Sequence, residues 1–220
     1  MNAAWHRAHR LPSHATAAAR LAWHLQHERA CGCRPMPAPL AAIDSAETRA
    51  ALRRLLDGQD SRTLSQSAAA RRLIDDRPAR VADLAAIAGH PNWVVAMRAL
   101  DLLEKLARAH PEWVQPHRAV FLKAADSDQW LIRLQVVRAL PLLRWSPKQR
   151  ADAVSILRAN IDYPQAFVQA WSLDGLATFA ATDATLRPLV TRTLARFERS
   201  DRAALRARAR QIRVRLEMMA

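Results

Sequence analysis

Hydrophobic residues recur along this chain at helical spacing, each time after an aromatic residue. Trp93, Trp130 and Phe167 stand 37 residues apart. The apolar residues that follow them are three or four positions apart: Met97, Leu100 and Leu103, then Leu134, Val137 and Leu140, then Trp171. Such spacing places side chains on one face of an α-helix, and a repeat period of about 20–50 residues is typical of stacked helical repeats. The pattern therefore predicts a solenoid of helix pairs.

Proline, glycine and capping residues divide the chain into successive helices. Glycine is scarce, with four residues, whereas Ala, Leu and Arg, which favour helix, are abundant. We therefore predict an all-α fold, a right-handed α-solenoid of about five antiparallel helix pairs. The expected helices are 15–30 (capped by Thr16), 44–56, 61–74, 79–88, 92–109, 112–125, 128–144, 148–159, 165–180, 184–198 and 201–218.

Each helix pair has one apolar stripe that only the neighbouring pairs can cover, so stacking builds a continuous core. We expect Trp93, Trp130, Phe167 and Trp171 to help fill this core. The alternative is that these aromatic side chains contact a ligand or stack on nucleobases. In either case the second helices of the pairs are expected to line an extended concave surface.

Residues 116–133 carry the most specific pattern within the repeat. Pro116 precedes the apolar pair 121–122, Asp126 and Asp128 lie in the following turn, and residues 130–133 (Trp-Leu-Ile-Arg) open the next helix. This order resembles HEAT-type repeats, in which a proline and an apolar pair lie in the first helix, an aspartate in the turn and an arginine in the second helix. The resemblance covers about 45–220.

The HEAT-like pattern is incomplete in the neighbouring repeats. By the spacing of 37, the position of Arg133 is Ala96 in the preceding repeat and Ala170 in the following one. The period therefore supports the resemblance more than any single residue does.

The repeat favours a binding function. The chain has no Gly-rich phosphate loop and no nucleophile elbow, and its acidic pairs lie at turns, where helix capping explains them. We therefore favour a non-enzymatic scaffold or adaptor that binds a protein or acidic partner on its concave face.

The alternative is a DNA-binding or DNA-repair protein. In size, helical repeat and basic charge, the chain is similar to the alkylpurine DNA glycosylases built from HEAT-like repeats. This resemblance implies Trp and Asp residues on the concave face, and Trp171 and Asp174 are the close pair in a second helix. Their spacing does not match the family pattern well, so the resemblance is architectural.

Charge is concentrated at the C-terminus. The net charge is +14, and residues 185–220 hold ten arginines against three acidic residues. In the last helix one ridge of arginines lies beside an apolar stripe of Leu205, Ala209, Ile212 and Leu216, and guanidinium groups suit phosphate. The other interpretation is that the ridge is the polar outer face of a terminal repeat. The candidate partner- or phosphate-binding residues are Arg133, Arg202, Arg206, Arg210 and Arg213.

Residues 1–40 differ from the rest and are predicted to form a separate N-terminal segment, followed by a repeat domain over 41–220. They hold five of the eight histidines and both cysteines, and they end in a Pro-rich stretch, 34–39, that is typical of a linker. Trp5 is expected on an irregular arm.

The N-terminal segment contains a candidate metal site. His24 and His27 are one turn apart on the expected helix 15–30, and Cys31 and Cys33 lie at its end. Imidazole and thiolate are ligands that Zn²⁺ prefers. His6, His9 and His14 could compete as ligands; redox-active thiols, or side chains that only pack or lie in solvent, are the alternatives. We expect no cofactor, with zinc as the exception.

The expected compartment is the cytoplasm. The N-terminus lacks the apolar region of a signal peptide, and no apolar run approaches the roughly 20 residues that span a bilayer. Two cysteines so close together do not suit an ordinary structural disulfide. We therefore expect a protein partner, with nucleic acid as the alternative and no membrane.

Overall fold

A computed structural model describes residues 1–61 and 65–217, and within these ranges the regular structure is helical, with no strand. This confirms the all-α prediction. The chain divides into two compact units, Met1–Arg54 and Leu55–Ala220. No helix among the described residues has the length and apolar character needed to cross a bilayer.

The first unit begins with a short helix that the sequence did not predict. Residues around Trp5 form α1 (Ala3–Ala8) instead of an irregular arm, because the Asn2 side chain accepts a hydrogen bond from the Trp5 N–H and caps the helix. The next helix, α2 (Ala17–Ala30), confirms the predicted cap, since Thr16 Oγ1 accepts from the Ala19 N–H at 3.2 Å.

The third helix, α3 (Ala38–Leu56), begins earlier than expected, inside the Pro-rich stretch. Pro39 occupies the first turn, where the missing N–H of proline leaves no hydrogen bond unmade. The predicted division into 1–40 and 41–220 stays a prediction.

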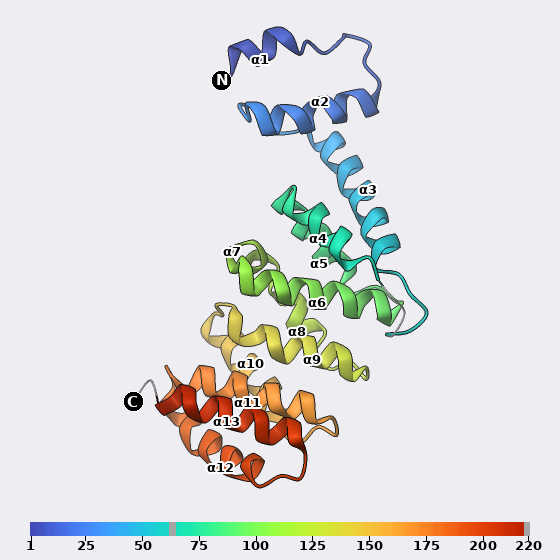
Figure 1. The fold of residues 1–220 in the computed structure, drawn as a ribbon. Coiled ribbons are helices and arrows are strands. Elements are labelled where there is room, and N and C mark those ends of the chain that lie inside the picture. Colours follow the sequence, from blue (N-terminus) through green and yellow to red (C-terminus); the bar gives the residue numbers. More distant parts are fainter. Residues whose placement is uncertain (62–64, 218–220) are drawn as a thin grey trace. The chain divides into compact units, whose positions relative to one another are not determined.

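The second unit is built from helix pairs, shown in Figure 1. After α4 (Ser67–Asp75) and η1 (Pro78–Arg80), the pairs are α5 (Val81–Ile87) with α6 (Trp93–Ala109); α7 (Pro111–Val114), η2 (Gln115–His117) and α8 (Ala119–Lys123) with α9 (Trp130–Ala139) and η3 (Leu140–Leu142); α10 (Pro147–Ala159) with α11 (Ala166–Ala180); and η4 (Ala184–Leu186) and α12 (Arg187–Glu198) with α13 (Ala203–Glu217). Helices α6, α9, α11 and α13 contact one another in that order and form one layer, which we call the second-helix face.

Two of the predicted helices are interrupted by proline. The segment 112–125 breaks at η2, which contains Pro116, and α9 ends at Ala139 because Pro141 follows. The helix expected over 61–74 begins at Ser67. Residues 62–64 of that prediction lie outside the described part of the chain.

The second helices confirm the repeat and correct its register. They begin at Trp93, Trp130, Ala166 and Ala203, which are 36 or 37 residues apart. The fourth residue of α9 is Arg133, whose Nε donates to the Ser127 carbonyl at 2.6 Å.

Two later helices carry the same contact at the same position. Gln169 Nε2 donates to the Tyr163 carbonyl, and Arg206 Nη1 donates to the Ser200 carbonyl, each at 2.6 Å. Each donor thus reaches the carbonyl six residues before it. The counterpart of Arg133 is therefore Gln169, not Ala170, and this side chain holds the turn that leads into the second helix.

The recurring aromatic residues do not fill the core, contrary to the prediction. Trp93, Trp130 and Trp171 are half-buried, and the Phe167 side chain is 56% exposed. Trp93, Trp130 and Phe167 lie in the first turn of their helices, at the edge of the layer. The fully buried side chains come from later turns and from the first helices, and include Leu100, Leu103, Phe121, Leu140, Leu157 and Leu173.

Candidate functional site

Trp171, on α11, lies beneath arginines from three other helices of the second-helix face. The guanidinium carbon of Arg208, on α13, is 3.7 Å from the centroid of the indole ring. The guanidinium carbons of Arg138, on α9, and Arg108, on α6, are 5.2 and 5.3 Å from it. Cations within about 6 Å of an indole centroid are attracted by the negative face of the ring. Arginines that are far apart in the sequence thus contact the same tryptophan ring.

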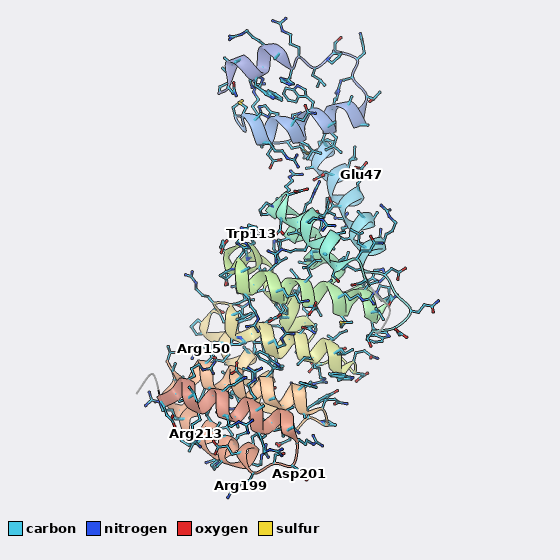
Figure 2. All side chains as sticks on the ribbon, viewed as in Figure 1. Glu47, Trp113, Arg150, Arg199, Asp201 and Arg213 are labelled. Atoms are coloured by element: carbon cyan, nitrogen blue, oxygen red, sulfur yellow. The ribbon has the colours of Figure 1, made fainter. Side chains whose placement is uncertain are left out.

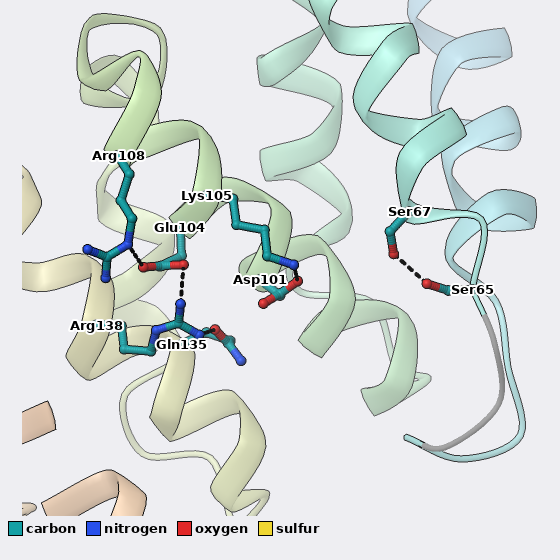
Figure 3. Close-up of polar contacts among 8 residues, drawn as sticks. All are labelled: Ser65, Ser67, Asp101, Glu104, Lys105, Arg108, Gln135 and Arg138. Carbon is teal, nitrogen blue, oxygen red and sulfur yellow. Dashed lines mark hydrogen bonds and ion pairs between the residues drawn. The ribbon is translucent and has the colours of Figure 1, made fainter. Parts of the chain in front are cut away.

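A buried carboxylate fixes two of these arginines. The Glu104 side chain is fully buried. Its Oε1 accepts from Arg108 Nε at 2.5 Å, and its Oε2 lies 2.9 Å from Arg138 Nη2 (Figure 3). Arg138 also donates to Gln135 Oε1 at 3.2 Å. Because a carboxylate away from water is stable only when paired, Glu104 holds both guanidinium groups in place.

Asp174 pairs with two arginines of α13, Arg208 and Arg215. Its Oδ1 lies 3.3 Å from Arg215 Nη2 and 4.0 Å from Arg208 Nη1, and its backbone carbonyl accepts from Arg215 at 3.3 Å. Asp174 follows Trp171 by three residues on α11. Ring and carboxylate therefore face the same neighbouring helix.

The cluster has more positive than negative charge, with four arginines against two carboxylates. Burial, together with repulsion from the other three arginines, lowers the pKa of Arg208, and the attraction of Asp174 opposes this. The side chains of Arg108 and Arg215 are each 41% exposed, so the cluster opens to solvent. We call Trp171 with Arg108, Arg138, Arg208, Arg215, Glu104 and Asp174 the arginine–tryptophan site. An anion at this site would relieve the repulsion.

In the first unit, the structure gathers His6, His27, Cys31 and Cys33, which we call the His/Cys cluster. Their ligand atoms all lie within 4.8 Å of one another. Cys33 Sγ is 3.3 Å from His27 Nε2 and 3.4 Å from His6 Nε2. His24 is not part of this group: its ring packs edge-on against Trp23, 5.0 Å between centroids. Whether the cluster binds a metal stays a prediction.

The chain reversal after α2 builds this cluster. The N–H groups of Cys31 and Gly32 both donate to the His27 carbonyl at 2.8 Å, and Gly32 has φ of +60°. This is a glycine-terminated helix end, in which the left-handed residue turns the chain back. The turn brings Cys33 to His27.

The two thiols have different acidities. The Asn2 N–H donates to Cys31 Sγ at 3.0 Å, and this contact is the main reason that the pKa of Cys31 falls to about 6. A hydrogen bond to Cys31 raises the pKa of Cys33. Cys31 is therefore the more acidic of the two thiols.

Comparison with known proteins identifies the fold and no more. No family model and no curated protein matches the chain. Among solved structures, two engineered proteins determined by the Northeast Structural Genomics Consortium align with TM-scores of 0.54 and 0.52, at 15% and 16% sequence identity. The alignments cover 91% of this chain in both cases, and 93% and 91% of the engineered chains. The fold is a HEAT-like helical repeat. A designed armadillo repeat protein, YIII(Dq)4CqI, aligns with a TM-score of 0.49 at 14% identity, over 89% of this chain and 91% of that one.

The arginines predicted from sequence lie elsewhere on the HEAT-like repeat and mostly contact the protein itself. Arg202 donates to the Pro164 carbonyl at 2.9 Å. Arg213 makes two hydrogen bonds to Glu198, at 2.6 and 2.9 Å, which lower the pKa of that carboxyl group. Arg210 is exposed.

Arg133 and Arg206 make the backbone contacts described above, and Arg133 also lies over the Tyr163 ring, 5.0 Å from its centroid. A role for any of the five predicted arginines in partner binding stays a prediction.

Sequence reasoning named Trp171 and Asp174 but missed the four arginines around them. With about 3.6 residues per turn, Arg208 and Arg215 lie on one side of the buried stripe of α13, and the predicted ridge lies on the other. The signals in the sequence were the seven-residue spacing of Arg208 and Arg215 and the four-residue spacing of Glu104 and Arg108. Neither spacing shows that α6 and α13 bring their arginines to Trp171 on α11.

Proposed function

We propose that this HEAT-like repeat is a non-enzymatic scaffold that binds an acidic protein segment on its second-helix face, at the arginine–tryptophan site. The observation that carries the proposal is the set of four arginines, from three helices, around one indole ring and two carboxylates. Guanidinium groups bind carboxylates through two parallel hydrogen bonds, so several in one place suit a run of Asp or Glu side chains.

The arginines are held in position before any partner arrives. Glu104 fixes Arg108 and Arg138, and Asp174 contacts the two arginines of α13. Ordering a long side chain on binding costs about 0.5–1.5 kcal/mol, and preorganisation removes much of that cost. The site therefore resembles a binding surface more than a solvated charged face.

The packing of Trp171 favours protein over nucleobase as the ligand. Arg208 lies 3.7 Å from the ring centroid, so it already covers a face of the indole on which a base would stack. The surface offered to a partner is made of guanidinium edges, which recognise carboxylate or phosphate oxygens.

DNA binding is the second candidate function, and the charge distribution supports it. The chain carries 34 basic and 20 acidic side chains, and half of the excess lies in residues 185–220. In this reading the arginines contact backbone phosphates, and affinity falls steeply with salt because counterions are released. The cytoplasm is the compartment that we propose for either function, since neither Cys31 nor Cys33 is in a disulfide.

One titration separates the two functions. Fluorescence anisotropy of a labelled polyglutamate peptide and of a labelled DNA duplex is measured against the full chain, at low and physiological salt. At physiological salt we expect the peptide to bind more tightly than the duplex does. The double variant R208A/R215A should weaken peptide binding at least tenfold. A control double variant, R202A/R210A, removes equal charge from the other side of α13. Tighter binding of the duplex supports DNA binding, and no binding of either probe at low salt refutes both proposals.

A further inference from the structure

We propose that His6, His27, Cys31 and Cys33 bind one zinc ion, which joins α1 to α2. This inference concerns the first unit and is independent of the proposed binding function. It also changes the ligand set expected from the sequence, because His6 from α1 takes the place that was given to His24.

The distances within the cluster suit a tetrahedral ion. Zinc lies about 2.3 Å from a thiolate and about 2.0–2.1 Å from an imidazole nitrogen, so tetrahedral ligand atoms are about 3.3–3.8 Å apart. The Nε2–Sγ distances of 3.3 Å from His27 to Cys33 and 3.4 Å from Cys33 to His6 match this separation. The remaining ligand atoms are within 4.8 Å. Side-chain rotations of small amplitude therefore close a two-histidine, two-cysteine site.

The imidazole of His27 is already oriented for coordination. It is 1% exposed, and the Trp23 indole stacks on it with 5.0 Å between centroids and 5° between planes. Trp5, from α1, also packs against it, with 5.4 Å between ring centroids. Surrounding contacts that fix a ligand's orientation are typical of metal-binding histidines.

The Asn2 N–H supplies a similar contact to sulfur, donating to Cys31 Sγ at 3.0 Å. The segments around α1 and α2 thus contribute the ligands and also the groups that hold them. The occupant that this set favours is a zinc ion with mixed nitrogen and sulfur coordination.

The first unit needs such a link because its apolar core is small. Helix α1 has six residues and none of them is buried. Within residues 1–54, all of which the structure describes, the buried hydrophobic side chains are Leu21, Leu40 and Leu52. Domains of this size usually depend on disulfides, metals or oligomerisation. Zinc bound by residues from both helices would supply the missing stabilisation.

The test is metal binding by the full chain after chelation and gel filtration in reducing buffer. Zinc is titrated against a chromophoric chelator, and Co²⁺ is added separately to read the coordination from its visible spectrum. We expect one equivalent of zinc, with Co²⁺ giving intense d–d bands and a thiolate charge-transfer band typical of tetrahedral sulfur coordination. The variant C31S/C33S should lose both signals.

Histidine variants test the ligand set itself. H6A and H27A should each weaken zinc at least tenfold, whereas H24A, the matched control one turn earlier on α2, should change affinity less than twofold. Far-UV circular dichroism of each variant checks that α2 is intact. Absence of stoichiometric zinc binding, or an H24A effect as large as that of H6A, overturns the proposal.

Discussion

The two sides of α13 carry arginines in different surroundings. On one side, Arg208 and Arg215 meet arginines of α6 and α9 around Trp171, where two carboxylates only partly offset them. On the other side, Arg206 donates to the Ser200 carbonyl in the turn before α13, and Arg213 pairs with Glu198. Charge on a helix is therefore a poor guide to a binding surface by itself. The useful feature is several positive groups held within reach of one ligand.

Replacing Glu104, the buried carboxylate of the arginine–tryptophan site, should have the largest effect on stability. E104A removes a fully buried charge and leaves Arg108 and Arg138 without their partner, which typically costs about 3–5 kcal/mol. We expect the free energy of unfolding, measured by urea denaturation, to fall by that amount.

The control for Glu104 lies on the same helix. Asp101 pairs with Lys105, whose side chain is 54% exposed, at 2.7 Å (Figure 3). Breaking a pair of this kind with D101A should cost less than about 1 kcal/mol. Equal losses in the two variants would contradict the view that Glu104 is the anchor of the site.

Loss of the indole should mainly affect binding. W171L keeps an apolar side chain but removes the ring that Arg108, Arg138 and Arg208 contact. We expect the affinity for polyglutamate to fall about tenfold, equivalent to about 1.4 kcal/mol. W130L, at a half-buried tryptophan in the first turn of α9, should leave the affinity within twofold. If both variants weaken binding equally, the arrangement around Trp171 is not what the partner recognises.

The smallest effect on stability is expected from replacing Arg213, on the other side of α13. R213A removes two hydrogen bonds to Glu198 between side chains that are 48% and 30% exposed, so solvent screening keeps the loss of stability small. Because Arg213 lowers the pKa of Glu198, this stabilisation is present above the ordinary glutamate pKa of about 4.3 and is lost as pH falls through the lowered value. The stabilities of R213A and wild type should therefore converge in acid. A difference that persists there would show that the pair is not its source.

Local signals in the sequence predicted the helices well, because caps and turns act within a few residues. Thr16, for example, caps the helix that it was expected to begin. The 37-residue period predicted the repeat, since stacked pairs of equal length return at equal spacing. The burial of Trp93, Trp130 and Phe167 was predicted wrongly, because a period does not tell which turn of the helix faces the core.

The two candidate sites could be predicted only where their residues are close in sequence. His27, Cys31 and Cys33 lie within one helix end, whereas His6 joins them through the packing of α1 on α2. The arginines around Trp171 come from helices whose meeting depends on the stack of helix pairs. No spacing along the chain contains that information. Figure 2 draws the side chains on these helices, with Arg213 of α13 labelled.

Charge reversal at two positions of α13 tests the central claim most directly. R208E and R210E change the net charge equally and lie two residues apart, but they point to opposite sides of the buried stripe. The dissociation constant for polyglutamate is measured for both at physiological salt, with thermal unfolding as a check on folding. We predict that R208E weakens binding more than tenfold while R210E changes it less than threefold. Equal weakening, or a larger effect of R210E, would show that the partner recognises the outer ridge or total charge and not the arginine–tryptophan site.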